Sequence, residues 1–113
     1  MENTDKFTPL RKGLLEFLIL NIVSSRKVYA ADILKRLSKT DFATQEGTLY
    51  PLLSKMRREG LLDYEWQESD LGPPRKYYKL TDTGHQQLVE FRQYWQFLTN
   101  FIQELGENDN ANR

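Results

Sequence analysis

The chain has 113 residues, the length of one domain, and its 16 basic residues balance 16 acidic ones. The absence of cysteine excludes disulfides, thiolate metal sites and a cysteine nucleophile, and the single histidine excludes a metal site built from several histidines. The longest apolar run, residues 14–23, is interrupted by Glu16 and Asn21 and is too short to span a bilayer. The N-terminus lacks the segments of a signal peptide, so we expect a cytoplasmic protein with no membrane partner.

The charges are distributed unevenly along the chain. Residues 1–79 carry 14 Lys and Arg against 11 Asp and Glu, whereas residues 80–113 carry 2 against 5. A protein that binds nucleic acid needs a basic face and not a basic net charge. An offset of this size is also common in proteins that bind no nucleic acid, so it decides little alone.

Two segments near the N-terminus have the spacing of helices. Thr8 is a suitable N-cap and Pro9 suits the first helical position, so we expect a helix from there to about residue 24. Apolar residues occur on all its sides, which is typical of a central core helix. A second, short helix is predicted over residues 29–37, where apolar residues recur every three to four positions.

A third helix is predicted from an N-cap at Thr44 to about Glu59, with Gly60 as the left-handed residue that ends it. Its apolar side keeps the helical period and consists of Leu49, Leu52, Leu53 and Met56. Pro51 inside the segment removes a hydrogen bond and crowds the preceding turn. We therefore expect either a kink at this position or a helix that starts late.

The period changes after Gly60. Leu62, Tyr64 and Trp66 alternate with polar residues, which predicts a strand with these three side chains on its buried face. Residues 69–74 have the composition of a turn, and residues 75–80 alternate again. The two strands together predict a β-hairpin.

The last helix, capped by Thr81 or Asp82, has the most regular pattern in the chain. Its apolar stripe follows a heptad spacing and consists of Leu88, Phe91, Trp95, Leu98, Ile102 and Leu105. The helix could reach ~35 Å at the usual rise per residue, so it cannot bury this whole face on its own small domain. We predict that a second copy of the chain covers the stripe and that these six residues form a homodimer interface.

The order of the elements predicts an α+β, mainly helical fold. Residues 1–81 would form a winged helix-turn-helix, in which three helices precede a β-hairpin wing. Residues 82–106 would form a long C-terminal dimerisation helix, and residues 107–113 a disordered tail.

In such a fold the third helix enters the major groove of double-stranded DNA and the wing lies beside the backbone. Polar side chains on the third helix and a basic pair in the wing are the candidates for DNA contact: Gln45, Thr48, Ser54, Lys55, Arg58, Arg75 and Lys76. The basic run at 55–59 alone is also typical of a solvated helix end. A second basic cluster on the wing favours DNA binding, whose affinity would depend on salt.

Three motifs resemble the PadR family of bacterial transcriptional regulators: residues 48–53 (TLYPLL), 59–62 (EGLL) and 72–84 (GPPRKYYKLTDTG). The resemblance covers about residues 10–90 and implies a winged-helix repressor that dimerises through its C-terminal helix. It also implies an operator with inverted repeats, often near the regulator's own gene. By the same resemblance, Tyr50 contacts a phosphate, and Arg75 and Lys76 form the basic tip of the wing.

The single C-terminal helix is similar to the short PadR subfamily, some members of which sense flat, hydrophobic, often toxic compounds and control efflux. Five aromatic rings fall within residues 91–101, and packing across a dimer explains most of them. The alternative is that Trp95 lines a flat cavity between the subunits. The candidate ligand-binding residues are Leu10, Leu14, Phe17, Phe91 and Trp95. A ligand there would change the spacing of the two recognition helices, which must match half-sites ~34 Å apart.

The sequence does not indicate an enzyme. His85 has no serine or cysteine partner nearby, the carboxylates are scattered, and no glycine-rich phosphate loop occurs. We therefore expect no catalytic residues, no cofactor and no metal. The remaining alternative is a winged helix that binds another protein through its aromatic helix, and the affinity for DNA distinguishes the two.

Overall fold

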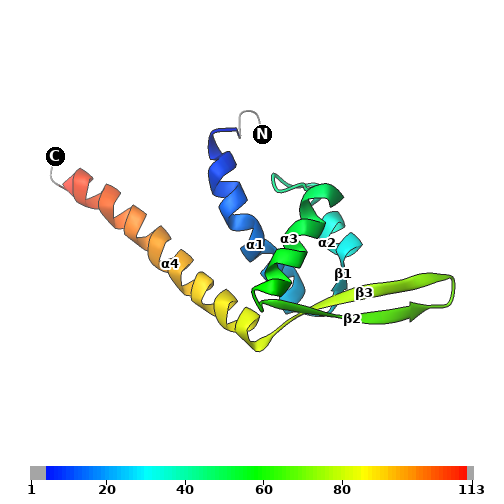
Figure 1. Ribbon diagram of the computed structural model, residues 1–113. Helices are drawn as coiled ribbons and strands as arrows, with labels where there is room; N and C mark the ends of the chain where they lie inside the picture. Colours follow the sequence, from blue (N-terminus) through cyan, green and yellow to red (C-terminus); the bar gives the residue numbers. More distant parts are fainter. Residues whose placement is uncertain (1–4, 112–113) are drawn as a thin grey trace.

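The computed structural model describes residues 5–111. In chain order the elements are a 3-10 turn (Asp5–Phe7), α1 (Thr8–Ser24), β1 (Val28–Tyr29), α2 (Ala30–Leu37), α3 (Glu46–Arg58), β2 (Leu62–Ser69), β3 (Gly72–Leu80) and α4 (Asp82–Ala111). The molecule is elongated, 67 × 34 × 21 Å, because α4 and the β2–β3 hairpin leave the body in different directions (Figure 1). This is the predicted winged helix with a long C-terminal helix. No helix among the described residues is long and apolar enough to cross a membrane.

The core lies where the C-terminal half of α1 meets α2, α3 and the base of the hairpin. Its buried side chains are Ile19, Leu20, Ile22, Val23, Val28, Ala30, Ile33, Leu37, Leu49, Leu53, Met56, Leu61, Leu62, Tyr78 and Leu88. The N-terminal half of α1 projects beyond this core, so Leu10 is exposed and Leu14 only half-buried. The prediction that α1 is a central helix therefore holds for its second half.

A short strand that the sequence pattern did not predict completes the sheet. The strand order is β1-β3-β2, and all pairs are antiparallel. Val28 pairs with Tyr78 and Tyr29 with Tyr77, and the two tyrosine rings stack with their centroids 4.0 Å apart. The predicted second helix consequently begins at Ala30 instead of Tyr29, which is its N-cap.

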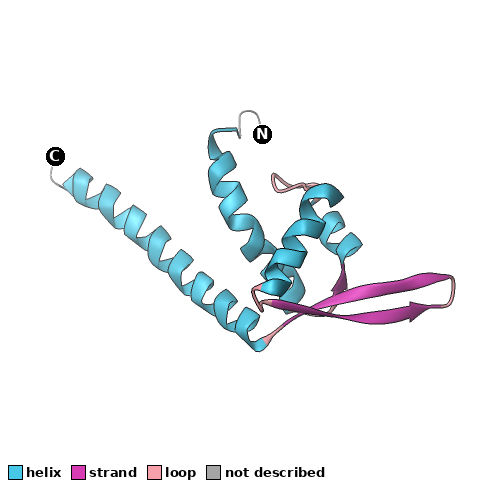
Figure 2. Ribbon diagram, viewed as in Figure 1, coloured by secondary structure: helices cyan, strands magenta, loops and turns pink. Residues whose placement is uncertain are grey.

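The hairpin is longer than predicted. β3 begins at Gly72, so only Asp70 and Leu71 remain in the turn, and the two prolines after Gly72 belong to the strand. The strands extend past the helices into solvent (Figure 2). As a result the predicted buried face is buried only at its base: Leu62 is buried and Tyr64 half-buried, but Trp66 is 61% exposed.

The predicted N-caps Thr8 and Thr44 are wrong, because the hydroxyl of each is hydrogen-bonded to another nearby group. The N-cap of α1 is Phe7, and the Thr8 hydroxyl instead accepts a hydrogen bond from the Arg11 guanidinium at 2.9 Å. The N-cap of α3 is Gln45, because the Thr44 hydroxyl donates to the carbonyl of Phe42 at 2.9 Å. α3 thus begins later than predicted.

The start of α4 is fixed tightly to the end of α3. The Thr81 hydroxyl donates to the Gly60 carbonyl at 2.6 Å and accepts from the Gly84 N–H at 2.9 Å, so Thr81 is the cap of α4. Gly60 has the predicted left-handed conformation, with φ 77°. A Cβ added to Gly84 would lie 2.1 Å from the carbonyl oxygen of Leu61. We call this contact the Thr81–Gly84 joint.

α4 is also longer than predicted. The sequence placed its end at residue 106 and a disordered tail over 107–113, but the helix continues through Ala111. Gly106 costs a helix only about 1 kcal/mol, and no proline follows it, so the helix is not interrupted there. Residues 112–113 of the predicted tail lie outside the described residues.

Candidate functional site

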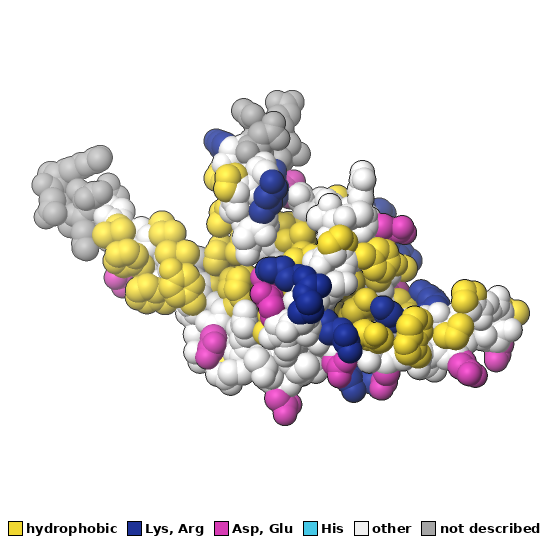
Figure 3. All heavy atoms as spheres, viewed as in Figure 1, with side chains coloured by type: hydrophobic (Ala, Val, Ile, Leu, Met, Phe, Trp, Pro, Cys, Tyr) yellow, Lys and Arg dark blue, Asp and Glu magenta, His cyan; other side chains and the backbone are white. Residues whose placement is uncertain are grey.

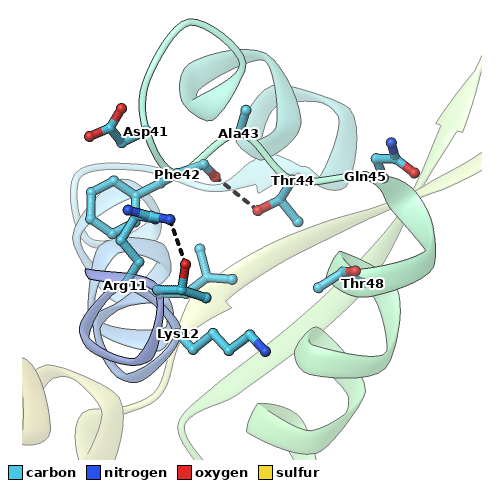
Figure 4. Close-up of a pocket in the computed structure, with 10 residues that line it drawn as sticks. Arg11, Lys12, Asp41, Phe42, Ala43, Thr44, Gln45 and Thr48 are labelled. Carbon is cyan, nitrogen blue, oxygen red and sulfur yellow. Dashed lines mark hydrogen bonds between the residues drawn. The ribbon is translucent and has the colours of Figure 1, made fainter. Parts of the chain in front are cut away.

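The exposed side of α3 opens onto three clefts, and the first lies at its N-terminus. This cleft has a volume of about 290 Å³ and separates α1 from the loop before α3. Gln45 and Thr48, two of the predicted DNA contacts, line it together with Lys12 of α1. Figure 4 shows the Lys12 side chain extending from α1 towards Thr48. The cleft thus places a cation beside the start of the helix that would read the bases.

A second cleft, which we call the wing cleft, separates the base of the hairpin from α2 and α3. Its volume is about 320 Å³, and Tyr50, Arg75 and Lys76 line it, as does Trp66. The guanidinium of Arg75 lies over the ring of Tyr29, 3.5 Å from its centroid. Tyr50, for which the resemblance implies a phosphate contact, is therefore close to both predicted cations of the wing.

The third cleft is a narrow groove of about 150 Å³ between the C-terminal half of α3 and the hairpin. The predicted residues Ser54, Arg58 and Lys76 line it. Arg57 also lines it and lies over the Tyr64 ring, 4.5 Å from the centroid. The groove therefore gathers cations from two elements that are distant in sequence.

Lys55 differs from the other predicted DNA contacts, because a carboxylate of α1 pairs with it. Its Nζ lies 2.6 Å from Glu16 Oε1 and 3.7 Å from Glu59 Oε2, and the hydrogen bond to Glu16 raises the pKa of Lys55. Lys55 lines none of the three clefts. The structure therefore brings seven of the eight predicted residues to the clefts and directs Lys55 towards α1.

The resemblance implied that Arg75 and Lys76 form the tip of the wing, but the structure places neither of them there. Arg75 pairs with Gln67 and Lys76 with Trp66 in the ladder, whereas Asp70 and Leu71 form the tip. The two prolines belong to β3, so the hairpin extends further than the predicted turn allowed. Arg75 and Lys76 consequently lie nearer the body, where they can act together with α3.

The sequence analysis did not select three residues that line these clefts. Lys12 was missed because its helix was interpreted as a core element, and Trp66 because its alternation predicted burial. Arg57 belongs to the same basic run as Arg58, and its contact with Tyr64 depends on the packing of β2 against α3. The basic run at 55–59, which includes Arg57, was the usable sequence signal.

A separate apolar groove lies between α1 and α4. Its volume is about 560 Å³, and all five predicted ligand-binding residues line it: Leu10, Leu14, Phe17, Phe91 and Trp95. Phe17 and Phe91 stack with centroids 4.0 Å apart at the closed end, and Trp95 lies 5.9 Å from Phe91. These five residues come from α1 and α4 of one chain, so the groove exists before any second subunit is added.

A polar contact holds α1 against α4 beside this groove. The Arg92 guanidinium donates to Asn21 Oδ1 at 2.8 Å, and the Asn21 amide donates to the Phe17 carbonyl. Asn21, a polar residue within the apolar run of α1, is thereby explained. Within the described residues, no three carboxylate or imidazole groups come together as metal ligands.

The predicted dimerisation stripe becomes more exposed along α4. Leu88 is buried, Phe91 and Leu98 are half-buried, and Ile102 is 60% exposed. Trp95 and Leu105 are exposed as well, as are the flanking rings of Tyr94, Phe97 and Phe101. Figure 3 shows apolar side chains gathered along α4 and cations gathered around α3 and the base of the wing.

Comparison with known proteins agrees with the fold. Residues 19–90 match the model of the transcriptional regulator PadR-like family. Transcriptional regulator Rv3488 of Mycobacterium tuberculosis is 33% identical over 82 residues, which cover 73% of this chain and 76% of the relative. A PadR-like transcription factor from Bacteroides fragilis has a similar structure, with a TM-score of 0.78, 40% identity and coverage of 89% of this chain and 98% of that one.

A PadR-like transcriptional regulator from Bacillus cereus is similar to the same extent, with a TM-score of 0.77, 40% identity and coverage of 87% and 96%. The family match extends from the core half of α1 into α4 and so includes α3, the wing and the joint. Family members regulate transcription and are not enzymes. The chain belongs to the PadR-like family of transcriptional regulators.

Proposed function

We propose that this regulator is a dimeric bacterial repressor that binds an inverted-repeat operator in the cytoplasm and responds to a flat hydrophobic molecule. One observation carries the proposal: the groups suited to DNA and those suited to a second subunit lie on separate parts of the molecule. Cations and hydroxyls line the clefts around α3, whereas α4 presents an exposed apolar stripe. A dimer formed through α4 therefore leaves both DNA-binding surfaces free.

The dimer is supported by the size of the exposed apolar face. Seven apolar side chains of α4 between residues 94 and 105 are half-buried or exposed, and they form a continuous face. Contiguous apolar surface of this kind usually marks a protein interface. The interface of a twofold dimer is self-complementary, so the same stripe serves both subunits.

DNA binding is supported by the geometry of α3 and the wing. α3 would enter the major groove, and Gln45 and Thr48 lie at its N-terminal end, where recognition helices contact bases. Tyr50, Ser54, Arg58, Arg75 and Lys76 would contact phosphates along both sides of that groove. A twofold dimer presents two such surfaces, so its operator would be an inverted repeat.

The effector site is supported by the groove between α1 and α4. Trp95 is 38% exposed there, and its ring offers a flat apolar surface beside Phe91. A planar molecule between Trp95 and its copy in the partner would change the angle between the subunits. Because the Thr81–Gly84 joint fixes α4 to α3, that angle sets the spacing of the recognition helices. The ligand shifts DNA binding only if it prefers one spacing over the other.

The test of DNA binding is fluorescence anisotropy of a labelled duplex from the region upstream of the chain's own gene, against a scrambled duplex. We expect preferential binding that weakens as salt increases and saturates at two chains per site. Equal weak binding to both duplexes would contradict sequence-specific recognition of that region. Absence of binding at low salt would instead favour a winged helix that binds another protein.

The test of the effector site uses the dye 1-anilinonaphthalene-8-sulfonate, whose emission increases in apolar surroundings. We expect the dye to bind the unaltered regulator and to change its affinity for the duplex. Trp95→Ala should abolish both effects while DNA binding persists. Phe97→Ala removes a ring on the same helix that does not line the groove, and it should retain them. An unchanged response in Trp95→Ala would remove Trp95 from the site.

A further inference from the structure

Trp66 is a large exposed side chain in the middle of the wing. It shares one face of β2 with Leu62 and Tyr64, since alternate residues of a strand point to the same side. Exposure increases along this face from buried Leu62 through half-buried Tyr64 to Trp66, which is 61% exposed. A single exposed ring is common on protein surfaces. The neighbours of Trp66 are what indicate a binding role.

One cation lies directly beside this ring. Lys76 stands opposite Trp66 in the ladder, and its Nζ lies 5.3 Å from the Trp66 ring centroid and 4.4 Å from that of Tyr64. The Tyr64 ring meets Trp66 edge-on, with the centroids 6.1 Å apart. The face therefore ends in an aromatic surface with an ammonium group directly beside it.

Trp66 also lines the wing cleft with Tyr50 of α3. The described residues of this lining are Tyr29, Ala30, Ala31, Tyr50, Trp66, Pro74, Arg75, Lys76 and Tyr78, and they include two cations and no carboxylate. This lining suits an anion that also offers an apolar surface to the rings. Each nucleotide of a DNA strand supplies both an anionic phosphate and the apolar surface of a deoxyribose.

We propose that Trp66 packs against a deoxyribose of the operator backbone while Lys76 and the Tyr50 hydroxyl contact the flanking phosphates. The inference rests on the proposed DNA binding and names a wing residue that makes the contact. Because the bases of a duplex remain stacked, the ring meets the sugar edge and not a base face. The contact adds affinity at every sequence and fixes how far the wing lies from α3.

The chain has two tryptophans, Trp66 and Trp95, so Trp95→Phe leaves Trp66 as the only tryptophan emitter. The upstream duplex is added to this variant at low salt, and anisotropy of the labelled duplex measures binding in the same sample. We expect the Trp66 emission to change with the same midpoint as the anisotropy. If the duplex binds and the Trp66 emission stays constant, Trp66 does not contact DNA, although the regulator does.

Substitutions give a second, independent measurement. We expect Trp66→Ala to weaken duplex binding about 10-fold and Trp66→Phe about 3-fold, since phenylalanine keeps part of the packing surface. Gln67→Ala alters the opposite face of the same strand, where it pairs with Arg75, and should weaken binding less than Trp66→Ala. Equal affinity of Trp66→Ala and the unaltered chain would overturn the inference. Failure of the unaltered chain to bind any duplex would instead overturn the proposed function.

Discussion

The two tryptophans lie on different elements, Trp66 on the wing and Trp95 on α4, and in contrasting surroundings. Trp66 stands among the cations of the wing, with Lys76 beside its ring, whereas Trp95 stands among Phe17, Phe91 and leucines in the groove of α1 and α4. Both are exposed and both follow an apolar periodicity. The neighbours of each tryptophan, and not its ring alone, are therefore what distinguish the partner we propose for it: an anionic strand for Trp66 and an apolar surface for Trp95.

We expect the largest effect from disrupting the Thr81–Gly84 joint, which fixes α4 to the end of α3. Gly84→Ala places a Cβ 2.1 Å from the Leu61 carbonyl oxygen, so the first turn of α4 must move. We expect a loss of about 3 kcal/mol in the free energy of unfolding, measured by urea denaturation.

The matched control for this joint is Gly106→Ala, in the same helix. Within the described part of the chain, no atom outside its own helical surroundings lies within 4 Å of a Cβ added there. Alanine is the better helix former, so the variant should be as stable as the unaltered chain or gain up to about 1 kcal/mol. Equal destabilisation by both variants would contradict a specific role for the Leu61 contact.

A charge placed in the apolar stripe tests whether α4 forms the dimer interface. Ile102→Glu buries a carboxylate in the proposed interface, and we expect the dissociation constant of the dimer to rise roughly 100-fold, measured by analytical ultracentrifugation. Gln103→Glu adds the same charge at the neighbouring exposed polar position and should leave the dimer intact. A dimer that tolerates Ile102→Glu would require an interface elsewhere.

Loss of Arg75 and Lys76 removes the positive charge that distinguishes the wing cleft from the apolar groove between α1 and α4. Arg75→Ala combined with Lys76→Ala should weaken DNA binding about 10-fold at physiological salt and lower the slope of log affinity against log salt by about 2, evenly across sequences. Lys35→Ala combined with Arg36→Ala removes two exposed adjacent cations of α2 and is the control. An effect restricted to one operator sequence would mean that the wing reads bases.

Periodicity predicted the order of the helices and the hairpin, and Gly60 predicted the end of α3, because these features depend on local sequence. It could not predict β1, whose two residues acquire strand structure only by pairing with Tyr77 and Tyr78, some 50 positions away. The alternation of apolar and polar residues placed Trp66 on the correct face of β2. It could not show how far along the strand that face stays buried. The threonine caps failed for a related reason, since Thr8 and Thr44 each have a competing local partner.

The smallest effect concerns Lys55, which the sequence could not distinguish from Arg58. Both are exposed cations near the end of α3, but Glu16, 39 positions earlier, pairs with Lys55. We expect Lys55→Ala to weaken DNA binding less than about 2-fold and Arg58→Ala about 5-fold, in the same anisotropy assay. Equal losses would show that the ion pair opens when DNA binds.

The pH dependence of stability gives a check on this pair without DNA. Folding raises the pKa of Lys55 above its ordinary value of 10.5. The contribution of the pair to stability is therefore fully present below pH 10.5 and is lost as the pH rises through the raised pKa. Lys55→Ala should remove that part of the alkaline loss of stability, and Arg58→Ala should retain it. The two cations of α3 would then differ in whether a carboxylate already pairs with them.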